Sequence, residues 1–302
     1  MLLNHTLLLI LCVLYGLFFS LGKIALQFVE PFFFTGVRML VAGIVLLSYY
    51  YFTNKPRSAL NKAQWGYILI VALLCIYLTN AFEFWGLKFV SAGKTSLLCC
   101  FYPIVTAIIS WSFFKEIITR KKILGLFVGI LGFLPVLVNK ELTEEISGTI
   151  SIFSYAELAL LFASVATALG WLFARDAIKV HGINIILLNG MSMIIGGIMA
   201  MIHSYTCDTW DPLPVSNMKY FIIWLFVIIV VSNLICYNLH GYLLKKFTAT
   251  YISFANLTDP IFASFFGWLL LGEVLNYSFW LSIVFIGIGL SIYYKENIKL
   301  GE

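Results

Sequence analysis

The sequence has little charge. Only 11% of its 302 residues are Asp, Glu, Lys or Arg, whereas 62% are hydrophobic. A soluble domain averages about 25% charged and about 45–50% apolar residues. Too few polar side chains are present to cover a water-exposed globule, so the composition excludes a soluble protein.

Enzyme and metal motifs are lacking as well. The sequence holds no Walker loop, no HExxH and no Gly-x-Ser-x-Gly motif. No metal-ligand spacing appears among the six cysteines, which are Cys12, Cys75, Cys99, Cys100, Cys207 and Cys236. The net charge of +5 has a topological explanation, because basic residues of membrane proteins gather in cytoplasmic loops. We therefore expect no metal, no cofactor and no nucleic-acid partner.

What the sequence does have is a series of ten apolar runs, each about as long as the 20 residues that a helix needs to cross a bilayer. They cover 5–26, 31–53, 65–87, 92–113, 121–139, 154–174, 183–203, 219–242, 249–271 and 277–294. Backbone groups in lipid must be satisfied within their own segment, which favours helices over open strands. The sequence thus predicts an all-α integral membrane protein with ten transmembrane helices and the lipid bilayer as its surroundings.

Basic residues indicate the orientation. If the N-terminus is cytoplasmic, most lysines and arginines fall in inner loops, including Arg120-Lys121-Lys122 and Lys245-Lys246. Such a bias marks the cytoplasmic side. We therefore expect a multi-pass protein with both termini in the cytoplasm.

An internal repeat relates two parts of the chain. Residues 87–116 align without gaps to residues 244–273, at an offset of 157. The uncommon identities are Lys88/Lys245, Pro103/Pro260, Trp111/Trp268 and Glu116/Glu273. The copies fall in the fourth and ninth predicted spans, five apart, so they run in opposite directions. This pattern predicts two inverted five-helix halves, 1–145 and 146–302, with a cavity between them at the membrane midplane.

These residues resemble a known family. Ser91-Ala92-Gly93, Pro103 and Glu116 in the first half, with Asp259-Pro260 and Glu273 in the second, are similar to the EamA-like ten-helix branch of the drug/metabolite transporter superfamily. Asp259 departs from the glutamate that is common before the proline, and Lys115 replaces a frequent glycine. The resemblance implies secondary transport of a small metabolite across a bacterial inner membrane.

Asp259 is the sharpest candidate for a substrate-binding residue. A charge inside a bilayer costs about 2.5–3.5 kcal/mol on insertion scales, so its presence indicates function. Asp259 lies near the middle of its predicted span and precedes Pro260, which breaks the helix as Pro103 does in the other repeat. We expect both prolines to mark helix breaks with a gating role. The alternative is a purely structural ion pair between Asp259 and a basic residue.

Further candidates lie in the second, third and eighth spans. Arg38 would grip a substrate carboxylate, reach the headgroups, or neutralise Glu83. Asn80 and Glu83 share one face of the third span, and Tyr237 and His240 form a matching stripe on the eighth. A hydrated histidine at the membrane boundary is the interpretation we favour for His240.

The remaining candidates are an aromatic residue, an asparagine, two lysines, a repeated glutamate and a glycine motif. Tyr102 next to Pro103 would line an aromatic cavity, and Asn256 would contact substrate or the freed backbone. Lys23 and Lys94 flank the outer mouth, where either would attract anions or, as we expect, extend toward the outer headgroups. A repeated glutamate, Glu116 and Glu273, is expected to cap or brace a loop. The motif Gly125-xxx-Gly129 would support packing between the halves or a homodimer.

Three classes of function remain open from the sequence. The leading one is a carrier of a small polar or zwitterionic metabolite, such as an amino acid or S-adenosylmethionine. An integral-membrane enzyme acting on a lipid-linked substrate would require paired carboxylates at the membrane surface. A non-transporting scaffold would be favoured if Asp259 and Arg38 faced each other in a sealed core.

Overall fold

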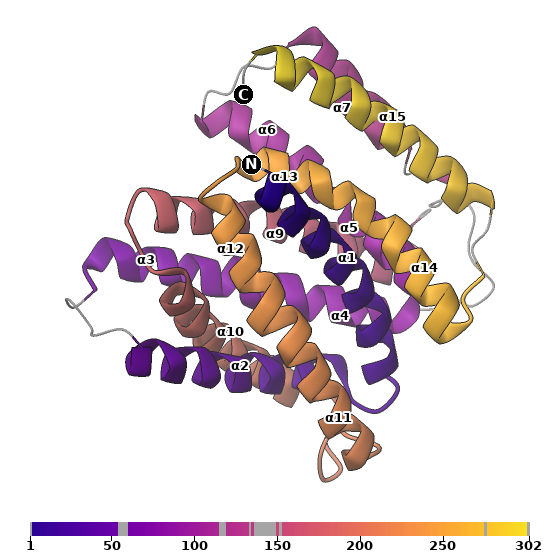
Figure 1. Cartoon of the computed structure of the whole chain (residues 1–302). Coiled ribbons are helices and arrows are strands. Elements are labelled where there is room, and N and C mark those ends of the chain that lie inside the picture. The colour runs from indigo at the N-terminus through magenta and orange to yellow at the C-terminus, as the bar shows by residue number, and fades with distance from the viewer. Residues whose placement is uncertain are drawn as a thin grey trace.

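The computed structural model describes residues 2–53, 60–114, 119–132, 134–135, 149–150, 153–274 and 277–300. Nearly all of them are helical (Figure 1). The helices are α1 Leu2–Ala25, α2 Pro31–Thr53, α3 Lys62–Val71, η1 Ala72–Leu78, α4 Thr79–Phe89, α5 Ala92–Cys99, α6 Tyr102–Phe114, α7 Arg120–Leu131, α9 Tyr155–Lys179, α10 Ile185–Cys207, α11 Met218–Ile228, η2 Ile229–Cys236, α12 Tyr237–Leu244, α13 Ala249–Ala255, η3 Asn256–Thr258, α14 Asp259–Leu271 and α15 Tyr277–Leu300. Two short strands, β1 Thr149–Ile150 and β2 Phe153–Ser154, pair antiparallel.

Eight helical stretches of the described residues are long and apolar enough to cross a membrane, and each coincides with a predicted span. For the predicted span 121–139, the structure describes α7, which ends at Leu131. For the span 277–294 it gives α15, in which Tyr277–Gly289 forms a shorter apolar stretch. The predicted all-helical membrane fold is confirmed, whereas the count of ten spans stays a prediction.

Two of the long helices contain a π-helical segment that the sequence pattern did not predict. These segments are η1, between α3 and α4, and η2, between α11 and α12. They begin at Ala72 and Ile229, which are related by the same offset of 157 as the sequence repeat. A π-helical segment adds a residue to a turn and often marks a functional site. Each contributes a residue, Cys75 or Ser232, to the lining of the same cavity.

The fourth and ninth predicted spans are broken near their prolines. In the first, α5 ends at Cys99 and α6 restarts at Tyr102, one residue before Pro103. In the second, the 3₁₀ turn η3 separates α13 from α14, which restarts with Pro260 in its first turn. A proline lacks the N–H that would continue the helix, and its fixed φ suits the first turn of a new one.

Corresponding helices of the two sequence halves pack in pairs. Figure 1 shows α7 beside α15 at one edge of the bundle and α2 beside α10 toward the opposite edge. A Cβ at Gly289 of α15 would lie 2.5 Å from the carbonyl oxygen of Gly125 in α7. A Cβ at Gly43 of α2 would likewise lie 2.9 Å from the carbonyl oxygen of Gly190 in α10. Gly125 thus serves packing of α7 against α15, one of the two uses expected of its motif.

One end of the bundle is closed by polar contacts. We call it the distal end, and it comprises residues 26–30, 90–91, 208–217 and 272–274. Val29 forms a β-bridge with Val215, and the N–H of Glu30 donates to the carbonyl of Pro214 at 3.0 Å. The Asp208 carboxylate accepts a 2.7 Å hydrogen bond from the N–H of Phe33. These contacts join the α1–α2 connection to the α10–α11 connection.

Candidate functional site

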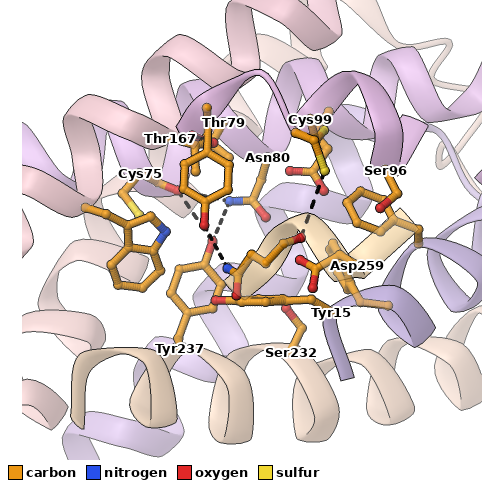
Figure 2. Close-up of a pocket in the computed structure, with 17 residues that line it drawn as sticks. Tyr15, Cys75, Thr79, Asn80, Ser96, Cys99, Thr167, Ser232, Tyr237 and Asp259 are labelled. Atoms are coloured by element: carbon orange, nitrogen blue, oxygen red, sulfur yellow. Dashed lines mark hydrogen bonds between the residues drawn. The ribbon is translucent and has the colours of Figure 1, made fainter. Parts of the chain in front are cut away.

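A cavity lies among the central parts of the long helices (Figure 2). It includes six of the eight predicted binding residues, namely Asn80, Glu83, Tyr102, Tyr237, Asn256 and Asp259. Arg38 and His240 do not line it. They lie directly behind lining residues.

Asn80 and Tyr237 meet at the centre of this cavity. The Asn80 Nδ2 group donates to the Tyr237 hydroxyl at 2.8 Å, and Figure 2 shows the two side chains pointing toward each other. They are 157 residues apart, so they occupy equivalent positions of the repeat. Asn80 also donates to the carbonyl of Ile76 at 2.9 Å, and Tyr237 to that of Cys75 at 3.4 Å. The contact therefore satisfies carbonyls that the π-helical segment η1 leaves open.

Arg38 is completely buried, with none of its surface exposed, so it does not reach the headgroups, one of the three alternatives that the sequence left open. Its Nη2 donates to the Asn80 Oδ1, and its guanidinium lies 4.5 Å from the ring centre of Phe84 and 5.4 Å from that of Phe18. Arg38 and Glu83 attract each other electrostatically without a close ion pair. The guanidinium thus holds Asn80 in place and partly balances Glu83, rather than pointing into the cavity.

Asp259 stands on another side of the cavity, at the start of α14. Its neighbour across the helix break, Asn256, donates from Nδ2 to the Tyr102 hydroxyl at 2.8 Å. The Asp259 side chain is 7% exposed, and its Oδ1 is buried without a hydrogen-bond partner. Among the described residues it forms no ion pair, so the structural pairing considered for Asp259 is absent there.

His240 corrects one interpretation. We favoured a hydrated histidine at the membrane boundary, but its side chain is only 2% exposed. The imidazole stacks on the Trp171 ring at a centroid distance of 3.7 Å, and its Nδ1 shares a 3.1 Å hydrogen bond with the Tyr15 hydroxyl. Span position gave an approximate depth but did not show that α9 and α1 cover this face of α12. His240 orients two lining aromatics instead of facing water.

The two lysines expected at the headgroups are used inside the protein. Lys94 is fully buried and forms a 2.8 Å ion pair with Glu157 of α9. Lys23 donates to the carbonyl oxygens of Leu87, Lys88 and Val90, at the end of α4 and just beyond it. Snorkelling is therefore wrong for both. For Lys23 the reason is that the end of a helix offers free carbonyl groups that attract a cation.

Glu273 caps the first turn of α5 across the distal end. Its two carboxylate oxygens accept from the N–H of Ala92 at 2.9 and 3.1 Å. Burial raises the pKa of this carboxyl, although hydrogen bonds from the Ala92 and Gly93 backbone oppose the shift. The expected capping role holds for Glu273, while its repeat counterpart Glu116 lies outside the described residues.

Several lining residues were not singled out by the sequence analysis. They are Tyr15, Phe18, Phe19, Cys75, Thr79, Ser96, Cys99, Cys100, Thr167, Trp171 and Ser232. A usable signal existed for some of them, because Tyr15, Phe18 and Phe19 share one helix face by spacing, as do Thr167 and Trp171. Apolar and small polar residues are too common in such helices for that signal to stand out.

The lining defines what the cavity can bind. It combines five aromatic rings beyond Trp171 with hydroxyls, one pair of amides and two carboxylates, and it includes no lysine, arginine or histidine. Among the described residues, no group of three or more His, Cys, Asp or Glu side chains has the arrangement of a metal site. A cation can be held here by carboxylates and by aromatic faces.

A bundle of apolar helices with a cavity between their central parts is typical of membrane transporters. Comparison with known proteins gives the family. The EamA-like transporter family matches residues 3–138 and again residues 154–295. The chain belongs to the EamA-like transporter family, and hence to a class of transporters and not of enzymes.

Individual relatives agree with this membership. The chain is 35% identical to a protein of Chlamydia muridarum named S-adenosylmethionine/S-adenosylhomocysteine transporter, over 94% of this chain and 89% of the relative. It is 33% identical to the protein of the same name in Chlamydia trachomatis serovar L2, over 94% of this chain and 86% of the relative. A solved crystal structure shares the fold, with a TM-score of 0.66 and 13% identity over 98% of both chains.

Proposed function

We propose that this chain is a secondary transporter that carries S-adenosylmethionine, or a metabolite of closely similar chemistry, across the bacterial inner membrane. Two inverted halves, 1–145 and 146–302, would expose the central cavity alternately to either side, with both termini in the cytoplasm. The observation that carries the proposal is the cavity itself, in which carboxylates and aromatic rings surround the middle of the bundle. A homodimer stays a prediction.

The chemistry of the cavity suits this substrate. S-adenosylmethionine carries a sulfonium, an ammonium, a carboxylate and an adenine ring. Carboxylates and aromatic faces attract the cationic groups, and a ring such as Trp171 or Phe19 offers a surface for adenine to stack on. The amides of Asn80 and Asn256 and the hydroxyls of their partners Tyr237 and Tyr102 supply hydrogen-bond partners for the polar edges of the substrate. The names of the chlamydial relatives support the same substrate.

The repeat supports alternating access. The family matches each half of the chain separately, and the residues of the central contact, Asn80 and Tyr237, are equivalent by the repeat offset. A two-fold axis in the membrane plane lets the same contacts form on either side in turn. Asp259 and Arg38 do not face each other, which removes the observation that would have favoured a scaffold.

Counterflow in proteoliposomes tests the proposal. Vesicles preloaded with S-adenosylmethionine are diluted into a labelled panel of S-adenosylmethionine, S-adenosylhomocysteine, amino acids and nucleotides. We expect saturable, accelerated uptake of the two adenosyl compounds by wild type, loss of S-adenosylmethionine uptake in Asp259→Asn, and wild-type rates in Asp176→Asn. Asp176 lies on α9 outside the cavity lining, so its variant is a matched carboxylate-to-amide control. Counterflow only in vesicles preloaded with an amino acid, and none in those preloaded with S-adenosylmethionine, would reassign the substrate.

A further inference from the structure

The two carboxylates of the cavity are in different electrostatic situations. Glu83 is within the field of the buried Arg38 guanidinium, which attracts it. Asp259 has no such counterpart, since no basic side chain lines the cavity and no ion pair of Asp259 occurs among the described residues. When both cavity carboxylates are ionised, the Arg38 guanidinium behind the lining compensates Glu83, and the charge without compensation is that of Asp259.

The neighbours of Asp259 come from four elements, and all are neutral in their protonated forms. Electrostatic neighbours are Cys12 on α1, Cys99 and Cys100 at the end of α5, Tyr102 on α6 and Cys236 on η2. None of these groups supplies a positive charge. An uncompensated charge in a desolvated site is strongly unfavourable. The carboxylate, with a free buried oxygen, requires either a proton or a cation from outside the protein.

S-adenosylmethionine and S-adenosylhomocysteine differ in the positive charge that they bring to Asp259. S-adenosylmethionine has one net positive charge, because its sulfonium and ammonium outweigh its carboxylate. S-adenosylhomocysteine has a neutral thioether in place of the sulfonium and no net charge. S-adenosylmethionine therefore compensates the charge of an ionised Asp259. S-adenosylhomocysteine leaves that charge uncompensated.

We propose that Asp259 is the charge-selecting residue of this transporter: it accepts either the positive group of a cationic substrate or a proton. This inference rests on the proposed function and specifies its charge balance. S-adenosylmethionine displaces the proton from the Asp259 carboxyl to water when it binds, and S-adenosylhomocysteine binds together with that proton. Exchange of the two substrates then moves no net charge across the membrane.

The test measures binding of labelled S-adenosylmethionine, and competition by S-adenosylhomocysteine, to purified protein in nanodiscs across acidic to neutral pH. In wild type we expect acidification to weaken the binding of S-adenosylmethionine and to strengthen the binding of S-adenosylhomocysteine. Asp259→Asn, which imitates the protonated acid, should lose about tenfold or more in S-adenosylmethionine affinity. It should retain S-adenosylhomocysteine binding and lose both pH trends.

The matched variant is Glu83→Gln, which removes the other cavity carboxylate. It should keep the two opposite pH trends, whatever its absolute affinities, because Asp259 is still present. The inference is overturned if Asp259→Asn keeps the wild-type preference and pH trends, or if the trends disappear in Glu83→Gln instead. If wild type binds neither compound at any pH, the proposed substrate itself fails.

A second measurement needs no variant. Adding S-adenosylmethionine to wild-type protein in weakly buffered, mildly acidic solution should release protons in proportion to the protein present, detected with an indicator dye. Adding S-adenosylhomocysteine should release none. Equal proton release with both compounds would contradict the selection of charge at Asp259.

Discussion

At the scale of single residues, a buried ion pair connects the two halves of the sequence. Lys94 on α5 and Glu157 on α9 form an ion pair with 0% and 1% of their side chains exposed. Each charge was removed from water, so each depends on the other for compensation. Because one residue comes from each half, the pair ties the halves together near the distal end.

Lys94→Met should destabilise the protein by about 3–5 kcal/mol, since it leaves the Glu157 carboxylate buried without its partner. The double variant Lys94→Met/Glu157→Leu should recover most of this loss. Thermal unfolding in detergent, followed by tryptophan fluorescence, measures both. Equal losses in the single and double variants would contradict compensation within the pair.

Hydrogen bonds connect Arg38, Asn80 and Tyr237, and their removal should lower stability by different amounts. Tyr237→Phe removes two neutral hydrogen bonds, from Asn80 and to the Cys75 carbonyl, and we expect a loss of about 1–2 kcal/mol. Asn80→Leu removes the acceptor of the buried Arg38 guanidinium, so it should cost at least about 3 kcal/mol. The same unfolding assay compares them. A larger effect from Tyr237→Phe would mean that Arg38 does not depend on Asn80.

Sequence reasoning finds polar residues within apolar runs because their cost in lipid makes them conspicuous. Asp259, Asn80 and Tyr237 were identified in this way. It does not give the direction in which a side chain points, and for that reason Arg38 was a candidate for the site although it lies behind the lining, and His240 was expected to be hydrated although it is buried. Lys94 was misjudged because its partner, Glu157, is distant in the chain.

At the scale of elements, glycine allows a close approach between helices of the two sequence halves. In α15, Gly289 faces α7, where an added Cβ would be 2.7 Å from the backbone nitrogen of Gly129. Two residues earlier, a Cβ at Gly287 would meet nothing within 4 Å. The same helix thus provides both a contact glycine and its control.

Gly289→Ala should lower the free energy of unfolding by about 1–3 kcal/mol, the usual cost of overpacking. Gly287→Ala should be neutral or stabilise by up to about 1 kcal/mol, because alanine is the better helix former. Both are measured by thermal unfolding of the purified variants. If the two behave alike, α7 and α15 are not in the contact described.

The elements themselves were predictable to different degrees. Runs of about 20 apolar residues gave eight spans correctly, since the bilayer thickness imposes that length. The prolines indicated the interruptions at Pro103 and Pro260. The π-helical segments η1 and η2 left no mark in the sequence, because they depend on which side chains, such as Asn80, satisfy the displaced carbonyls.

At the scale of the whole molecule, contacts at the distal end join the two halves. They include the 208–217 connection bonded to residues 26–30 and the Glu273 cap on Ala92. Alternating access requires these contacts to break when the cavity opens to that side. The sequence repeat agrees with the two separate family matches, 3–138 and 154–295, whereas these contacts could not be predicted, since they involve loops without a recognisable pattern.

Sided labelling of the cavity tests the central claim most directly. Cys99 lines the cavity and is partly exposed, and Cys207→Ser removes the exposed thiol of α10. Oriented vesicles of each sidedness are treated with a membrane-impermeant thiol reagent, and Cys99 is followed by mass spectrometry of its peptide. We expect labelling from both sides, slowed in each case by S-adenosylmethionine. Labelling from one side only, with or without substrate, would contradict a cavity that opens alternately to both.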